Sequence, residues 1–100
     1  MEQKYLDQLD EIIIDLCHQI LTARHGEVKI VTWYFAKILT KRAELRSLCG
    51  YDVDKKAMDS VDEAIAEISG YVREIYSSDD FALAKNMMEI LIARAKLGSD

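Results

Sequence analysis

The strongest candidate for chemistry in this sequence is a strip of polar side chains near the N-terminus. Glu11, Asp15 and His18 stand at positions i, i+4 and i+7, so on a helix they share one face. Carboxylates and imidazoles are common ligands of divalent metal ions. The strip points away from the apolar residues of its segment, and the other histidine, His25, has no such strip. We therefore expect a solvated face, with no metal and no cofactor.

Motifs of the common enzyme classes are missing. The chain has no glycine-rich phosphate loop, HExxH pair, nucleophile elbow or paired-cysteine motif. Residues 6–10 (LDQLD) resemble the start of helical chorismate mutases, but those enzymes need an arginine where this chain has Ile20. RNases of the HEPN class place an arginine five residues before a histidine, and Ile13 and Ile20 stand at those positions here. We expect a protein that is not an enzyme.

Trp33 is the clearest candidate for partner binding. Helical periodicity puts it almost opposite the apolar stripe of its segment, with Lys29 and Lys37 one turn to either side. Tryptophan contributes disproportionately to the energy of protein interfaces. We predict that Trp33, Lys29 and Lys37 form a partner-binding surface. The alternatives are a wide helix face that wraps round and a segment whose first residues are not helical.

A second candidate surface is acidic. Asp59, Asp62 and Glu63 stand on or beside the outward face of the third expected helix, and residues 51–80 contain nine acidic and three basic side chains. Such a run is usually a solvated face, but it also suits docking of a basic protein. One form of this hypothesis is mimicry of a nucleic-acid backbone, which would inhibit a DNA- or RNA-binding protein.

The second expected helix is basic, which raises nucleic-acid binding as a further alternative. Residues 27–50 carry five basic and two acidic side chains, with Trp33 and Tyr34 among them. The neighbouring segments are acidic, so complementarity within the fold explains this pattern more simply. The net charge of −5 also argues against general binding to nucleic acids or anionic membranes. We do not expect direct DNA or RNA binding.

Arg42 occupies a position where the second helix expects an apolar residue. A buried unpaired charge costs several kcal/mol, so Arg42 must find water or a carboxylate. We expect its long stem to reach water near the end of the core. A buried ion pair and a ligand-binding guanidinium are the alternatives.

Four helical segments must position these residues. Apolar residues recur every three or four positions over about 3–24, 27–48, 54–76 and 79–97. Proline is absent and glycine occurs four times, with Gly26 and Gly50 placed to end helices. Asp52 and Asp54 are alternative caps for the third segment, and residues 77–80 (SSDD) can cap the fourth.

These segments predict a single all-α domain over residues 1–100. Short connections make sequential helices antiparallel, so we expect an up-down four-helix bundle. Residues 1–26, 27–50, 51–80 and 81–100 have net charges of −3, +3, −6 and +1, which favours sequential helices as neighbours. The apolar stripe at residues 12–14 (III) is wide enough to suggest a homodimer as well.

Compartment and function follow from what remains. No secretory signal and no span of roughly 18 apolar residues is visible, which favours a cytoplasmic protein with Cys17 and Cys49 as free thiols. We expect a small acidic protein that binds another protein as an adaptor, regulator or inhibitor. The alternatives are the acidic nucleic-acid mimic and a nucleic-acid-binding helical protein.

Overall fold

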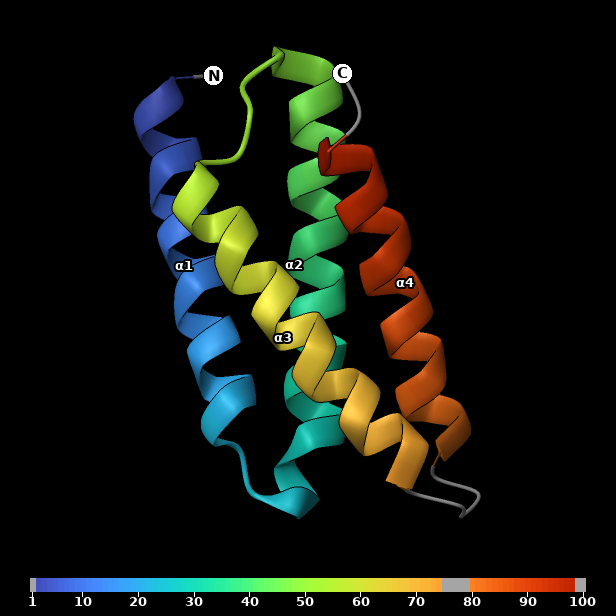
Figure 1. Ribbon diagram of the computed structural model, residues 1–100. Coiled ribbons are helices and arrows are strands. Elements are labelled where there is room, and N and C mark those ends of the chain that lie inside the picture. Colours follow the sequence, from blue (N-terminus) through green and yellow to red (C-terminus); the bar gives the residue numbers. More distant parts are fainter. Residues whose placement is uncertain (1, 75–79, 99–100) are drawn as a thin grey trace.

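The computed structural model describes residues 2–74 and 80–98, and all regular structure within them is helical (Figure 1). Helix α1 spans Gln3–Thr22, a short 3-10 turn spans His25–Glu27, and α2 spans Val28–Cys49. Helix α3 spans Lys55–Glu74 and α4 spans Asp80–Gly98. The all-α class and the four helices are therefore confirmed. The suggested cap at residues 77–80 lies largely outside the described part of the chain.

The ends of α1 and α2 differ because only one of the two glycines turns left-handed. Gly50 has a φ of 75°, and its N–H donates to the Arg46 carbonyl at 2.8 Å, which closes α2. Helix α1 instead ends at Thr22, where Ala23 becomes extended with φ −66° and ψ 145°. Gly26 falls within the 3-10 turn and does not have a positive φ, so the expected left-handed cap there is wrong.

Of the two candidate caps before α3, Asp54 serves as the cap. Its carboxylate accepts a hydrogen bond from the Lys56 N–H at 3.2 Å. Asp52 instead pairs with Arg46 of α2 at 2.9 Å, across the connection between the helices.

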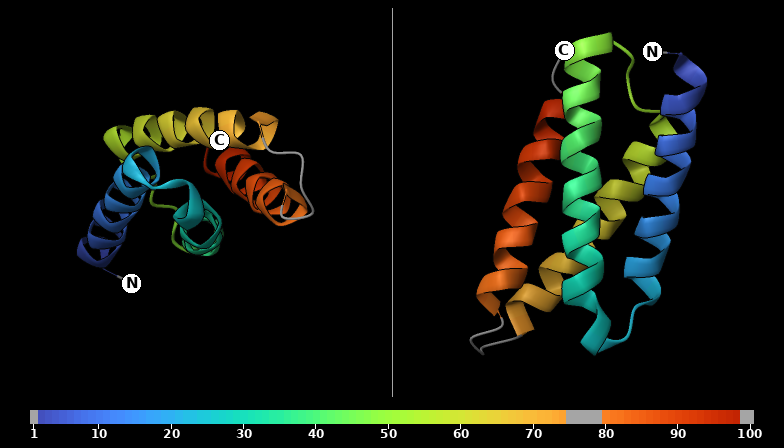
Figure 2. Two further views of the ribbon diagram at one scale, coloured as in Figure 1. Left: turned by 90° about the horizontal axis from the view of Figure 1, so that it is seen from below. Right: turned by 180° about the vertical axis from the view of Figure 1, so that it is seen from behind.

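One hydrophobic core lies between the helices, and all four contribute to it. Its fully buried aliphatic and aromatic members include Ile13, Ile20, Phe35, Leu39, Val61, Ile68 and Ile90. Burial of each such side chain contributes about 1.5–3 kcal/mol. Figure 2 shows α3 crossing obliquely over α1 and α4, with α2 on the other side of the core. Within the described residues, no helix is long and apolar enough to cross a membrane.

The closest helix pairs differ from those that the charge pattern favours. Helix α2 packs most extensively against α4, and α1 against α3, whereas the consecutive helices α2 and α3 are not a closely packed pair in the described residues. Exposed charge pairs contribute only about 0–1 kcal/mol each, so burial of apolar surface outweighs them in choosing neighbours.

This packing divides the charge between two layers. Helix α1 carries one basic and four acidic side chains and α3 carries three and five, so this pair nets −5. Helix α2 carries five basic and one acidic side chain and α4 carries three and two, so the other pair nets +5. One layer of the molecule is therefore acidic and the other basic.

Candidate partner-binding face

Trp33 lies on the outer side of α2, among aromatic and charged neighbours. Its side chain is 46% exposed, and its ring meets that of Tyr34 edge-on, with the ring centroids 5.0 Å apart. The Lys37 Nζ lies 5.6 Å from the centre of the Trp33 ring, within reach of a cation–π interaction. Lys37 also pairs with Glu89 of α4 at 3.5 Å. Trp33 is helical, so the alternative of an irregular segment start does not hold at this residue.

Lys29 lies one turn before Trp33 and lines the same hollow. The hollow has a volume of about 390 Å³ and is lined by Gly26, Lys29, Ile30, Trp33, Tyr34, Ala82 and Asn86. The amide of Asn86, from α4, is nearly buried and donates to the Thr32 hydroxyl at 3.2 Å and to the Lys29 carbonyl at 3.3 Å. These bonds tie α4 to α2 directly beside the hollow.

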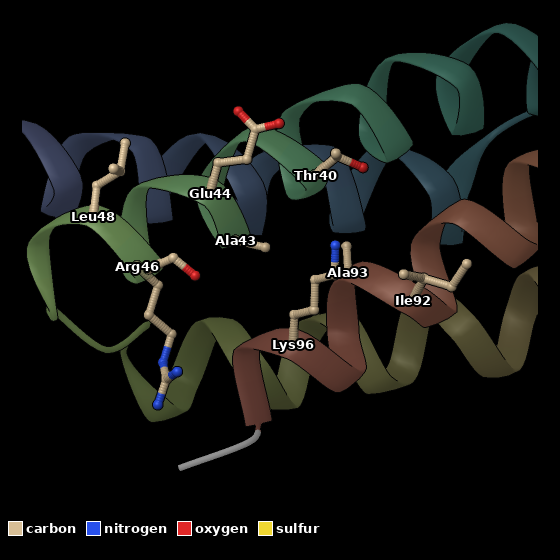
Figure 3. Close-up of a pocket in the computed structure, with 9 residues that line it drawn as sticks. Thr40, Ala43, Glu44, Arg46, Leu48, Ile92, Ala93 and Lys96 are labelled. Atoms are coloured by element: carbon tan, nitrogen blue, oxygen red, sulfur yellow. The ribbon is translucent and has the colours of Figure 1, made fainter.

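Two more hollows continue along the line where α2 meets α4. The second has a volume of about 310 Å³ and is lined by Lys37, Thr40, Lys41, Glu89 and Ile92. The third has a volume of about 600 Å³ and is lined by Thr40, Ala43, Glu44, Arg46, Ser47, Leu48, Ile92, Ala93 and Lys96 (Figure 3). The second and third share Thr40 and Ile92, and Lys37 follows Trp33 by one turn. We call the three hollows together the α2–α4 groove.

The α2–α4 groove has an apolar lining with basic side chains around it. Its exposed apolar residues are Ile30, Trp33, Tyr34, Leu48 and Ile92. In the third hollow, Leu48 and Ile92 stand at opposite ends and the buried Ala43 and Ala93 lie between them (Figure 3). The charged residues are basic Lys29, Lys37, Lys41, Arg46 and Lys96 and acidic Glu44 and Glu89.

The α4 half of this groove is the part that sequence reasoning missed. The signal was present, because α4 carries Phe81, Met88, Leu91 and Ile92 as exposed apolar residues, in addition to those that it buries. Helix α3, by contrast, has no large exposed apolar side chain. Apolar residues on more than one side of a helix indicate a second surface to cover.

No protein-family model, curated protein or solved structure matches the chain. The groove is therefore interpreted from its own residues.

The acidic residues predicted on α3 are partly engaged within the fold. Asp62 accepts two hydrogen bonds from Arg94 of α4, from Nε at 2.7 Å and from Nη2 at 3.2 Å. Asp59 pairs with Lys55 one turn away at 3.0 Å, while Glu63 is exposed. None of the three lines the α2–α4 groove, so the two predicted surfaces are separate.

The Asp62–Arg94 pair gives a pH dependence that can be measured. Hydrogen bonding from Arg94 lowers the pKa of Asp62, partial burial opposes this shift, and the charge of Arg94 adds to it. A lowered folded-state pKa stabilises the fold above the unfolded pKa of about 3.9, and this contribution is lost as pH falls through the folded value. We expect Asp62→Asn to cost about 0–1 kcal/mol at pH 7, because the pair is largely exposed. Urea unfolding should show this cost vanishing at pH 2–3, and an equal cost at both pH values would contradict it.

Arg42 does not reach water, so the expectation that its stem leads to solvent is wrong. The side chain is fully buried, and its Nε donates to Asp10 Oδ1 of α1 at 2.7 Å. Its Nη2 donates to the Tyr51 carbonyl at 3.0 Å, and Asp10 Oδ2 accepts the Asp54 N–H at 3.4 Å. Within the described residues, Nη1 is buried and has no hydrogen-bond partner. The alternative of a buried ion pair is the one that the structure contains, and it joins α1, α2 and the connection to α3.

The strip of Glu11, Asp15 and His18 is exposed along α1. In the described part of the chain, no group of three or more His, Cys, Asp or Glu side chains is placed to hold a metal ion.

The two cysteines are free thiols that differ in burial. Burial raises the pKa of the Cys17 thiol to about 12, partly offset by a backbone hydrogen bond and reinforced by the nearby Glu63 carboxylate. Since the thiolate is the reactive form, we expect alkylation at pH 8 to modify Cys49 first and Cys17 only when the protein unfolds. Mass spectrometry of Cys49→Ser during iodoacetamide treatment measures this, and rapid labelling of folded Cys49→Ser would contradict it.

Proposed function

We propose that this protein is a non-enzymatic interaction module that binds another protein through the α2–α4 groove. The observation that supports this is the row of exposed apolar side chains along one line of contact between helices: Ile30, Trp33, Tyr34, Ile92 and Leu48. Apolar residues scattered singly over a surface are ordinary, whereas an apolar strip with polar edges is typical of an interaction site.

The groove also meets the energetic needs of an interface. Asn86 and Thr32 tie its walls together, as does the pair of Lys37 with Glu89, so a partner meets a preformed surface. Preformed surfaces lose less conformational entropy on binding. Trp33 and Tyr34 are the residue types that most often dominate binding energy.

The acidic alternative has less support. A nucleic-acid mimic needs its carboxylates available to a basic target, whereas Asp62 and Asp59 are paired with Arg94 and Lys55. Only Glu63 among the three predicted residues has no pair printed on the acidic face, and a single carboxylate does not imitate a phosphate backbone.

The finer architecture and the compartment belong to the same proposal. An up-down antiparallel order of the helices is supported by the short connections at residues 23–27 and 50–54, which lie at opposite ends of the molecule (Figure 1). A cytoplasmic location is supported by the free thiols of Cys17 and Cys49.

Site-specific photocrosslinking in cells that naturally produce the chain tests this function. A benzophenone amino acid replaces Tyr34 in the groove or, as a matched control, Tyr5 on α1; these tyrosines are 52% and 53% exposed. We expect a discrete crosslinked adduct from position 34 and none from position 5. Adding Trp33→Ala should reduce the adduct at least tenfold, since an interface hot spot is worth about 2 kcal/mol or more. The circular-dichroism spectrum should stay unchanged.

The mass and identity of the adduct decide the outcome. A different protein supports the proposal, and a mass of two chains shows that the groove closes a homodimer instead. Equal crosslinking from both positions, or an adduct that survives Trp33→Ala, would remove the groove as the binding site.

A further inference from the structure

We propose that the α2–α4 groove binds an acidic amphipathic helix of its partner. This inference rests on the proposed function and specifies the chemistry of the partner. It follows from the charge around the groove, the spacing of its apolar parts and the direction in which it runs.

Charge complementarity selects the sign of the partner. The residues that line the groove include five basic and two acidic side chains, and they belong to the layer that nets +5. The two acidic residues pair with lysines of the same face, Glu89 with Lys37 and Glu44 with Lys41. Acidic side chains along the edges of a partner therefore meet an excess of positive charge, which accelerates association and disfavours basic partners.

The apolar parts of the groove are spaced for a helix. One lies at Trp33 beside Ala82, and the other lies at Ala43, Ala93 and Ile92. Ten residues of α2 separate Trp33 from Ala43, which is about 15 Å at 1.5 Å per residue. A helix laid alongside α2 presents apolar side chains at one position, one turn later, and again about ten residues from the first. Lys37 and Lys41 lie between these two regions, where acidic partner residues would pair with them.

A second copy of the chain fits this face less well. Two copies that join by the same groove would bring two basic faces together, and like charges in an interface oppose association. Joining the basic layer of one copy to the acidic layer of another would give an open chain of molecules, because each copy keeps both faces. An acidic helix of a different protein covers the groove without either difficulty.

Selection from a peptide library tests the inference. The library displays helical peptides of about 20 residues whose apolar and flanking positions vary among Leu, Ala, Glu and Lys. The whole protein is the target, and Trp33→Ala is used to remove peptides that bind elsewhere. We expect the enriched peptides to be net acidic, with apolar residues one turn apart and again about ten positions on. Their affinity should fall about tenfold or more between 50 and 500 mM salt.

Two variants with the same charge change locate the effect. Lys41→Glu reverses an exposed charge in the groove, whereas Lys56→Glu reverses an exposed charge on α3. The best acidic peptide should bind Lys41→Glu about fivefold or more weakly, and Lys56→Glu within about twofold of the unchanged protein. A single-stranded RNA oligonucleotide is included as a competitor.

The outcomes separate this inference from the proposed function. Neutral or basic peptides that still depend on Trp33 would overturn the acidic helix but leave the groove as a protein-binding site. An absence of Trp33-dependent peptides would overturn both. Equal effects of Lys41→Glu and Lys56→Glu would overturn the charge argument. RNA that binds the groove more tightly than any peptide would assign the basic face to nucleic acid instead.

Discussion

Replacing Asp10 with alanine should lower the free energy of unfolding by about 3–5 kcal/mol. The change leaves the guanidinium of Arg42 fully buried without its carboxylate, which had accepted Nε at 2.7 Å. It also removes the acceptor of the Asp54 N–H, at the start of α3. A domain of this size has a total stability of about 5–15 kcal/mol, so the loss is a large fraction of it. Urea unfolding followed by circular dichroism measures the difference.

Two further variants separate burial of charge from loss of a side chain. Asp15→Ala makes the same change at an exposed position of α1 and should alter stability by less than about 0.5 kcal/mol. The double variant Asp10→Leu with Arg42→Met replaces the ion pair with apolar groups and should recover most of the loss, because no charge remains buried. A cost of Asp10→Ala no larger than that of Asp15→Ala would show that the pair is not buried in solution.

Replacing Phe35 with alanine should cost about 3–5 kcal/mol, through lost transfer free energy and the cavity that remains. Phe35 is 0% exposed and belongs to the core cluster to which all four helices contribute. It lies only two residues from Trp33, yet the two side chains occupy opposite sides of α2. Phe35→Ala should therefore destabilise the fold, whereas Trp33→Ala should chiefly weaken partner binding.

Phe81→Ala is the matched control for this prediction. It removes the same side chain from α4, at a position that is 81% exposed. Its effect on the urea midpoint should correspond to less than about 0.5 kcal/mol. Similar costs for Phe35→Ala and Phe81→Ala would mean that α2 or α4 is turned differently about its axis.

The sequence by itself determined the helices, because helix formation is governed by local periodicity and local ends. Gly50 illustrates this: it follows the last turn of α2, and its left-handed φ of 75° closes that turn. The exposure of Trp33 was also predictable, since 100° per residue places it opposite the inward stripe. By contrast, Gly26 looked equally suited to end a helix, and only its surroundings decided that α1 ends earlier in an extended residue.

The tertiary structure decided which helices are neighbours. Charge alternation along the sequence favoured consecutive helices, whereas packing joined α2 to α4 and α1 to α3. Neighbours are chosen by the shape and area of buried apolar faces, which depend on all four helices at once and outweigh exposed charge pairs.

The same long-range packing decided the fate of Arg42 and the candidate site. Asp10 lies 32 residues from Arg42 in the chain, and no local pattern predicts that the two meet. The groove likewise needs α4 beside α2, so the sequence indicated Trp33, Lys29 and Lys37 but not the wall that completes their surface. Local chemistry fixed each helix and its exposed residues, and the burial shared among the four helices decided which of those residues form one binding face.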